Sequence, residues 1–263
     1  MVENKKRALI TGASSGIGKA LALEFASKGY NLFLTARNEA ALLHVAAECA
    51  GKFKIETEIY LADFSNLAAV DDLVRVLSAS GREFEILVNN AGFGVHGEFA
   101  KTELDIELKM LNVQLAAMVK LTKSLLPGMM ARKNGRVLNV ASVYSFAPVP
   151  FQAVYSACKA FMLSFSAALR EELKGSGVTV TVLCPGTTQT EFRARAGITE
   201  KNKSAGVSAE SVAQIAVRET LRGKHLVVPG FSNRLFVFFA RRLPFAFVPR
   251  VVRFINNARG VNE

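Results

Sequence analysis

The stretch TGASSGIG, residues 11–18, follows a short apolar run and leads directly into a helical pattern. Its three glycines permit a tight turn and let a ligand approach the backbone closely, because glycine has no Cβ. A strand, a glycine-rich turn and a helix in this order can bind a pyrophosphate at the free N–H groups of the helix N-terminus. The alternative at this point is a turn that needs glycine for steric reasons alone. The expected ligand contacts in the turn are Gly12, Ser14, Ser15, Gly16, Ile17 and Gly18.

Short apolar runs alternate with helical patterns as far as residue 230. This alternation is typical of a parallel sheet with helices on both faces, so we expect an α/β, Rossmann-like doubly wound sheet of about seven strands. The expected strands are Arg7–Ile10, Asn31–Ala36, Ile55–Ala62, Ile86–Asn90, Val137–Ala141, Val178–Cys184 and His225–Val228. The first expected helix follows the glycine turn and has Ile17, Leu21 and Phe25 on one face. A second helix begins at a Ser65 cap. Three later helices are expected to span Glu103–Leu126, Val154–Lys174 and Ala209–Arg222.

The composition fits one large globular domain in a reducing compartment. Half of the 263 residues are hydrophobic and 21% are charged, which excludes a disordered chain. The cysteines, Cys49, Cys158 and Cys184, have no metal-ligand spacing, so we expect no metal site and a cytosolic setting. The polar start, residues 1–7, lacks the pattern of a signal peptide, which also favours the cytoplasm. The net charge of +11 would suit nucleic acid, but no nucleic-acid-binding motif accompanies it, and we expect no such partner.

Tyr155 and Lys159 are four residues apart, so they lie on the same face of an expected helix. The reference pKa of tyrosine is about 10, and a nearby ammonium group favours the phenolate and lowers that pKa. The pair could therefore exchange a proton with a substrate near neutral pH. Ser142 follows an expected strand, at the edge where α/β sheets bind ligands, and its hydroxyl could donate to a substrate carbonyl. Taken alone, a tyrosine and a lysine at this spacing more often mark an ordinary helix surface.

In this order and spacing, the glycine turn, Ser142 and the Tyr155–Lys159 pair resemble the short-chain dehydrogenase/reductase family, whose TGxxxGxG signature is met by residues 11–18. The resemblance covers about residues 5–230 and includes the motif Asn89-Asn90-Ala91-Gly92 after the fourth expected strand. It implies an oxidoreductase that transfers a hydride between a nicotinamide cofactor and a ketone or secondary alcohol. It also implies that Tyr155 is the general acid/base.

The family's functional residues match positions along most of this range. The catalytic residues that the resemblance implies are Asn112, Ser142, Tyr155 and Lys159, with Asn112 holding a water in a proton relay to the lysine. The cofactor contacts that it implies outside the glycine turn are Asp63 at the adenine, Asn90, Ala91 and Gly92 along the cofactor, Pro185, Gly186, Thr187 and Thr190 at the nicotinamide carboxamide, and Tyr155 and Lys159 themselves.

The end of the second expected strand favours NADP(H) over NAD(H). An enzyme that uses NAD normally has an acidic residue there, which binds both ribose hydroxyls. This chain instead has Ala36 followed by Arg37, whose guanidinium can bind a 2′-phosphate with two hydrogen bonds. Ser15 departs from many NADP-preferring relatives, which have a second basic residue in the glycine turn. The alternative for Arg37 is a solvated loop charge.

The segment Thr187–Val207 is polar and lacks a clear period, so it resembles a mobile loop over a site. Apolar side chains near the expected entrance, among them Phe93 and Phe192, predict a largely apolar ketone or alcohol, such as a 3-oxoacyl or steroid-like compound. Other residues of this group are Val95, His96, Val149 and Phe151. Arg193 and Arg195 could bind a phosphate or carboxylate, or could be solvated loop charges. An NADP(H)-responsive regulator with little turnover and an epimerase or dehydratase are the competing functions.

The last part of the chain is the least typical. We divide the chain into a catalytic domain, residues 1–230, and an extension, residues 231–263, which holds seven phenylalanines, six arginines and one acid. Its uncharged runs are too short to span a bilayer. A wall of the substrate channel is the interpretation we favour, and a dimer contact or an amphipathic element at a membrane surface are the alternatives. We expect a homo-oligomer and, from the last alternative, peripheral membrane contact.

Overall fold

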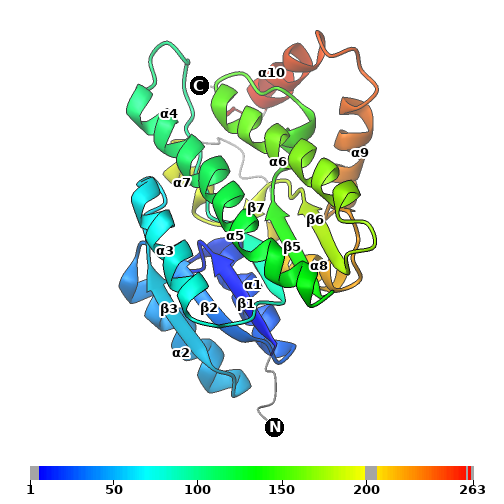
Figure 1. Ribbon diagram of the computed structural model, residues 1–263. Helices are drawn as coiled ribbons and strands as arrows, with labels where there is room; N and C mark the ends of the chain where they lie inside the picture. Colours follow the sequence, from blue (N-terminus) through cyan, green and yellow to red (C-terminus); the bar gives the residue numbers. More distant parts are fainter. Residues whose placement is uncertain (1–5, 199–205, 259, 262–263) are drawn as a thin grey trace.

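The computed structural model describes residues 6–198, 206–258, 260 and 261. Seven strands form one sheet in the order β3-β2-β1-β4-β5-β6-β9, and every neighbouring pair is parallel (Figure 1). The strands are β1 (Arg7–Thr11), β2 (Asn31–Ala36), β3 (Thr57–Leu61), β4 (Ile86–Asn89), β5 (Gly135–Val140), β6 (Val178–Leu183) and β9 (Leu226–Val227). The order reverses between β1 and β4, so the expected doubly wound α/β sheet is confirmed.

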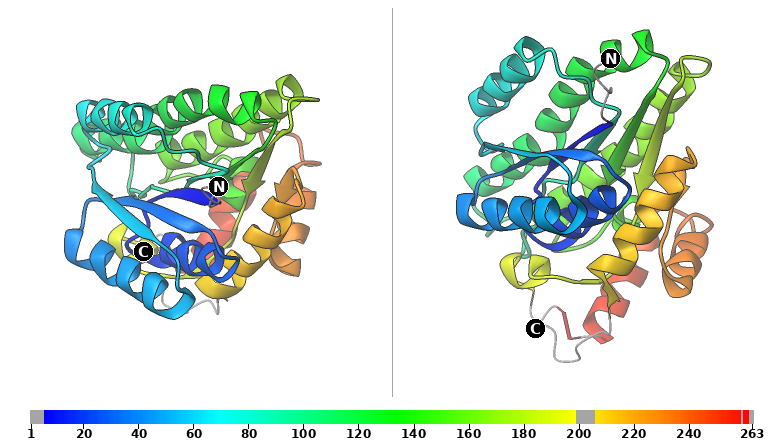
Figure 2. Two further views of the ribbon diagram at one scale, coloured as in Figure 1. Left: turned by 60° about the horizontal axis from the view of Figure 1, so that its bottom comes forward. Right: turned by 90° about the horizontal axis from the view of Figure 1, so that it is seen from below.

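Helices cover both faces of the sheet (Figure 2). One face packs against α1 (Gly16–Ser27), α2 (Glu39–Phe53) and α8 (Ala209–Leu221), whose apolar side chains form a single buried cluster with the strands. The other face packs against α3 (Leu67–Ala79), α5 (Ala117–Ala131) and α6 (Ala153–Glu172) in a second cluster. Because both faces of the inner strands are buried, these strands are largely apolar runs, which is why they were readable from the sequence.

Three features of the helices differ from the expectations. Ser65 is not a helix cap: α3 begins one residue later than that cap requires, and the side chain of Asn66 accepts a hydrogen bond from the Ala68 N–H at 3.0 Å. Helix α2 was not expected, although its buried residues, Leu42, Val45, Ala46 and Cys49, follow helical spacing. The long helix expected over Glu103–Leu126 exists as α4 (Leu104–Leu111) and α5, joined by a π-helical turn over Asn112–Ala116.

The segment expected as a loop over a site has some regular structure. Its described part contains β7 (Thr188–Gln189), which pairs with β8 (Val207–Ser208), and the one-turn helix α7 (Phe192–Arg195). Residues 199–205 of the segment lie outside the described residues.

The chain ends in two helices, α9 (Phe231–Ala240) and α10 (Val248–Ala258), which lie near the carboxyl ends of β5 and β6 (Figure 1). Val248 and Val252 on α10 are buried against Ala147 and Val149, which follow β5. Among the described residues, none of the helices combines the length and the apolar character that crossing a membrane requires.

A chain of buried polar side chains connects β4, β5, α5 and α6. Asn89 Nδ2 donates to Asn139 Oδ1 at 2.8 Å and to Thr122 Oγ1 at 3.1 Å. Asn139 Nδ2 donates to Ser166 Oγ at 2.9 Å, and that hydroxyl donates to the Met162 carbonyl at 2.6 Å. Three of these hydrogen bonds join different elements and the fourth lies within α6, so the chain fixes α5 and α6 against the centre of the sheet.

Replacing Asn139 with alanine should therefore destabilise the fold. The change leaves one donor of Asn89 and the Ser166 hydroxyl without their partner in a dry environment, which costs about 1–3 kcal/mol. Urea unfolding followed by circular dichroism measures the loss. Lys123→Ala on the exposed side of α5 is the control, with an expected change within about 0.5 kcal/mol. Equal stabilities of the two variants would show that the buried chain contributes nothing.

Candidate active site

The glycine turn is packed more tightly than any side chain would allow. A Cβ on Gly18 would lie 2.1 Å from the Gly12 carbonyl oxygen, and a Cβ on Gly12 would lie 2.8 Å from the Cα of Ala91. Gly12 and Gly16 also have positive φ values of +64° and +54°. The turn therefore brings the N-terminus of α1 against the ends of β1 and β4, with its backbone open to a ligand.

Side chains at the ends of β1 and β4 hold the turn in place. Asn90 Nδ2 donates to the carbonyl oxygens of Thr11 and Gly12 at 2.9 and 3.1 Å. The Thr11 hydroxyl accepts hydrogen bonds from the N–H groups of Asn90 and Ala91 and donates to the Val88 carbonyl. The asparagine expected beside a cofactor thus also has the structural role that the resemblance implies for its motif, in stabilising the sheet and the turn.

One cavity of about 970 Å³ lies over the carboxyl ends of the strands. It is lined by all the residues expected to contact a cofactor, from the glycine turn through Arg37, Asp63 and the Asn90-Ala91-Gly92 motif to Pro185, Gly186, Thr187 and Thr190. Ser142, Tyr155 and Lys159 line it as well. Most of the residues that the sequence singled out, from seven regions of the chain, are therefore brought to one place.

Asn112 is the exception. It does not line this cavity, and its side-chain Nδ2 donates to the Ser65 carbonyl at 3.0 Å. The residue begins the π-helical turn, and the next residue, Val113, lines the cavity instead. The expected role of Asn112 in a water relay to the lysine stays a prediction, and its side-chain amide already has a different partner.

Tyr155 and Lys159 lie on the buried face of α6, where they are only 7% and 5% exposed. Lys159 Nζ donates to the Val140 carbonyl at 3.0 Å, at the end of β5, and lies 5.5 Å from the centre of the Tyr155 ring. Ser142 follows β5 and caps a short 3₁₀ turn over Val143–Phe146. The end of one strand and one helix face thus supply all three polar groups.

Burial controls the ionisation of this pair. It raises the pKa of the Tyr155 phenol well above its usual value, and the hydrogen bond with Ser142 opposes only part of that rise. The same burial lowers the pKa of Lys159 to about 8. Desolvation of the phenol is therefore a larger effect in this structure than the lowering expected from the Lys159 cation. Tyr155 carries its proton at neutral pH.

Arg37, Asp63 and Lys109 give the far end of the cavity its charge. Burial opposes the ionisation of Asp63, but hydrogen bonds from Ser65 and the charges of Arg37 and Lys109 outweigh it and hold the pKa of Asp63 below its usual value. The carboxylate is therefore ionised near neutral pH. Lys109 was not identified from the sequence, because a single lysine on a helix has no distinguishing pattern.

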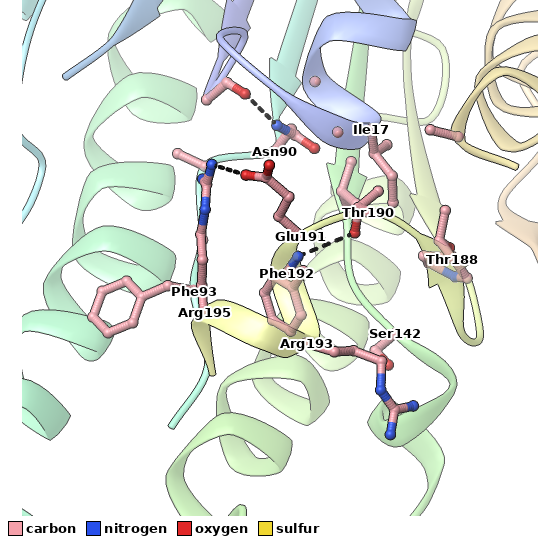
Figure 3. A pocket seen from close by; sticks show the side chains of 18 of the residues that line it. Ile17, Asn90, Phe93, Ser142, Thr188, Thr190, Glu191, Phe192, Arg193 and Arg195 are labelled. Carbon is pink, nitrogen blue, oxygen red and sulfur yellow. Dashed lines mark hydrogen bonds and ion pairs between the residues drawn. The ribbon is translucent and has the colours of Figure 1, made fainter. Parts of the chain in front are cut away.

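The apolar wall of the cavity differs from the one expected. Of the six residues expected near the entrance, Phe93 and Phe192 line the cavity (Figure 3). The Phe192 ring lies 5.6 Å from the Tyr155 ring, centre to centre. Val149 is buried in the contact with α10, and Phe151 lies beside His96. The remaining wall comes from α9 and α10, through Phe236, Val252 and Ile255.

The fold and the cavity define a doubly wound α/β protein with its ligand site where the strand order reverses, the place at which this class binds nucleotides. The family model for short chain dehydrogenases matches residues 6–201. The chain belongs to the short-chain dehydrogenase/reductase family of oxidoreductases.

Three relatives illustrate this similarity. The very-long-chain 3-oxoacyl-CoA reductase of Anas platyrhynchos is 36% identical over 182 residues, which cover 68% of this chain and 58% of that protein. This chain therefore matches less than two thirds of the length of that relative. A short-chain dehydrogenase from Sphingobium yanoikuyae in complex with NADPH is 30% identical and superimposes with a TM-score of 0.82 over 90% of this chain and 93% of its own. A 7β-hydroxysteroid dehydrogenase is 25% identical, with a TM-score of 0.84 over 94% and 96% of the two chains.

The shifted pKa of Lys159 should make stability depend on pH. Between pH 8 and 10.5, the folded protein has lost the Lys159 proton that the unfolded chain retains, so the free energy of unfolding rises with pH in this interval. Relative to Lys159→Met, the wild-type protein should gain roughly 3 kcal/mol over the interval. Urea unfolding of both proteins at pH 7, 8, 9 and 10 measures this difference. If the free energies of unfolding of wild type and Lys159→Met changed in parallel with pH, the lowered pKa of Lys159 would be contradicted.

Proposed function

We propose that this protein is an NADP(H)-dependent oxidoreductase that interconverts a secondary alcohol and a ketone, with Tyr155 as the general acid/base. The observation that carries the proposal is the placement of Ser142, Tyr155 and Lys159 on the same cavity as the glycine turn. A binding protein with little turnover has no need for a buried tyrosine beside a buried lysine, because burying the lysine is costly. This argues against the regulator considered from the sequence.

The cavity fits a dinucleotide. The space beside Gly12 and Gly18 is closed to a Cβ, which leaves the backbone N–H groups at the start of α1 available to a pyrophosphate. Arg37 follows β2 where an NAD enzyme has an acid, so it would bind a 2′-phosphate. Asp63 lies at the same end, where it would contact the adenine. When bound, NADPH supplies the hydride.

The chain's own groups handle the proton. In ketone reduction, the Ser142 hydroxyl donates a hydrogen bond to the substrate oxygen and Tyr155 gives that oxygen its proton. The raised pKa of the phenol keeps the proton in place near neutral pH until the oxygen becomes basic enough to take it. Lys159, fixed by the Val140 carbonyl, stabilises the phenolate that remains. Alcohol oxidation uses the same groups in reverse, with the phenolate accepting the proton.

The substrate is a largely apolar ketone or alcohol, of 3-oxoacyl or steroid-like type. The support is the wall formed by Phe93, Phe192, Phe236, Val252 and Ile255. The names of two relatives, a very-long-chain 3-oxoacyl-CoA reductase and a 7β-hydroxysteroid dehydrogenase, point in the same direction. The position of Phe236, Val252 and Ile255 on the cavity supports the role we favoured for the extension, as a wall of the substrate channel.

The outer side of the extension supports two further proposals, self-association and contact with a membrane surface. Phe231, Phe245 and Phe254 are at least three-quarters exposed, and residues 231–258 contain five arginines and no acid. A patch of this kind is costly to leave in water. Analytical ultracentrifugation tests for the homo-oligomer. Flotation with anionic vesicles at low and high salt tests whether the protein, which we expect in the cytoplasm, binds membranes peripherally.

Replacing Tyr155 with phenylalanine should abolish turnover while preserving the fold. The ring remains but the proton donor is lost, so kcat for ketone reduction should fall at least about 100-fold. A panel of ketones, followed by the loss of NADPH absorbance, first identifies a substrate for the wild-type protein. The Kd of the variant for NADPH, measured by nucleotide fluorescence, controls for cofactor binding and should stay within about twofold. Turnover close to wild type would refute the proposed mechanism.

Replacing Phe236 with alanine should affect long substrates more than short ones. The side chain lines the cavity from α9, so its removal takes contact area from a long apolar chain but not from a small ketone. KM for long substrates should rise about 5- to 20-fold, and KM for small ones should stay nearly constant. Phe245→Ala is the matched control on the exposed side of the extension. Equal changes in KM for long and small substrates would contradict the proposal that the extension lines the substrate channel.

A further inference from the structure

The glycine turn lacks a basic residue, and the structure brings one to it from a distant part of the chain. Ser15 and the other residues of the turn, 11–18, are all uncharged. Arg195 on α7 is 180 residues later, and its Nη1 donates to the Ser15 hydroxyl at 3.5 Å. Both residues line the cavity. A guanidinium therefore lies at the position that the sequence of the turn leaves uncharged.

The surroundings of Arg195 suit an anion. Ser15 precedes the first residue of α1, and its side chain makes no capping hydrogen bond, so the N–H groups at this helix end keep their partial positive charge. The guanidinium of Arg195 forms an ion pair with Glu191, one turn earlier on the same segment, as Figure 3 shows. A phosphate between α1 and α7 would meet the helix N-terminus and a forked cation together.

We propose that Arg195 is a phosphate-binding residue of the cofactor site and supplies the cation that the glycine turn lacks. The inference rests on the proposed use of NADP(H) and adds a residue to it. A cofactor phosphate and the Glu191 carboxylate compete for the same guanidinium, so Glu191 weakens cofactor binding while it holds Arg195 over the turn.

The neighbouring arginine does not share this role. Arg193 Nη1 donates to the Thr187 hydroxyl at 3.2 Å. The pKa of His96 is lowered mainly by burial, and the charge of Arg193 lowers it further. In Figure 3 its side chain extends toward Ser142, whereas that of Arg195 extends toward the glycine turn and Asn90. Of the two arginines that the sequence left undecided, only Arg195 is at the phosphate end.

Direct binding of NADPH and NADH to the full chain tests the proposal. We compare wild type with Arg195→Ala, Arg195→Lys and Glu191→Gln by nucleotide fluorescence, and follow the fold by circular dichroism. Arg75→Ala is the matched control, because Arg75 is also an exposed arginine paired with an acid on its own helix, Asp72, but lies outside the cavity.

We expect Arg195→Ala to raise the Kd for NADPH at least about 5-fold, Arg195→Lys to restore part of the loss, and Glu191→Gln to lower the Kd. An equal loss for NADH identifies the pyrophosphate as the ligand, and a loss confined to NADPH identifies the 2′-phosphate. The inference is overturned if Arg195→Ala binds NADPH within twofold of Arg75→Ala. It is also overturned if Glu191→Gln weakens binding as much as Arg195→Ala, because the ion pair would then only hold α7 in place. A wild-type protein that does not bind NADPH would instead refute the proposed function.

Discussion

The rest of the site depends on the contact between the glycine turn and the end of β4. Thr11 and Asn90 bind each other's backbones, and the amide of Asn90 also holds the Gly12 carbonyl. The helix that follows can begin there only because no Cβ occupies the space between Gly12 and Gly18. This contact fixes the direction of α1 relative to the sheet. The direction of α1 in turn decides where its N-terminal N–H groups point, and with them where a phosphate can bind.

The two ends of the cavity differ in their exposure to water. Tyr155 and Lys159 are almost completely buried, and both their pKa values move in the direction that disfavours charge. Arg37, Arg195 and Lys109 at the other end are exposed to water. Burial makes proton transfer sensitive to the few groups that touch the phenol, while exposure lets the cationic end exchange a highly charged ligand without a large desolvation cost.

Patterns that are local in sequence predicted most of the fold and of the site. The apolar strands, the glycine turn and the spacing of Tyr155 and Lys159 each lie within a few residues, so a single sequence contains the whole pattern. Features that depend on packing were not accessible in this way. The cap at Asn66 rather than Ser65 is a choice between neighbouring polar residues. The extension was favoured as a channel wall, but which of its side chains line the cavity depends on how α9 and α10 fold. Arg195 and Ser15 lie close together although they are 180 residues apart in the sequence, and no sequence motif relates positions that far apart.

The π-helical turn at Asn112–Ala116 sends three consecutive side chains to three different places. Asn112 binds the Ser65 carbonyl, Val113 faces the cavity, and Gln114 is fully buried and donates to the Phe93 carbonyl at 2.9 Å. A regular helix rotates by about 100° per residue, and a π turn accommodates one residue more than that geometry allows. Because the π turn absorbs one extra residue, loss of a residue here would give a more regular helix without turning the apolar face of α5 away from the sheet. The change would instead affect the site, because Asn112, Val113 and Gln114 could not all keep their present positions.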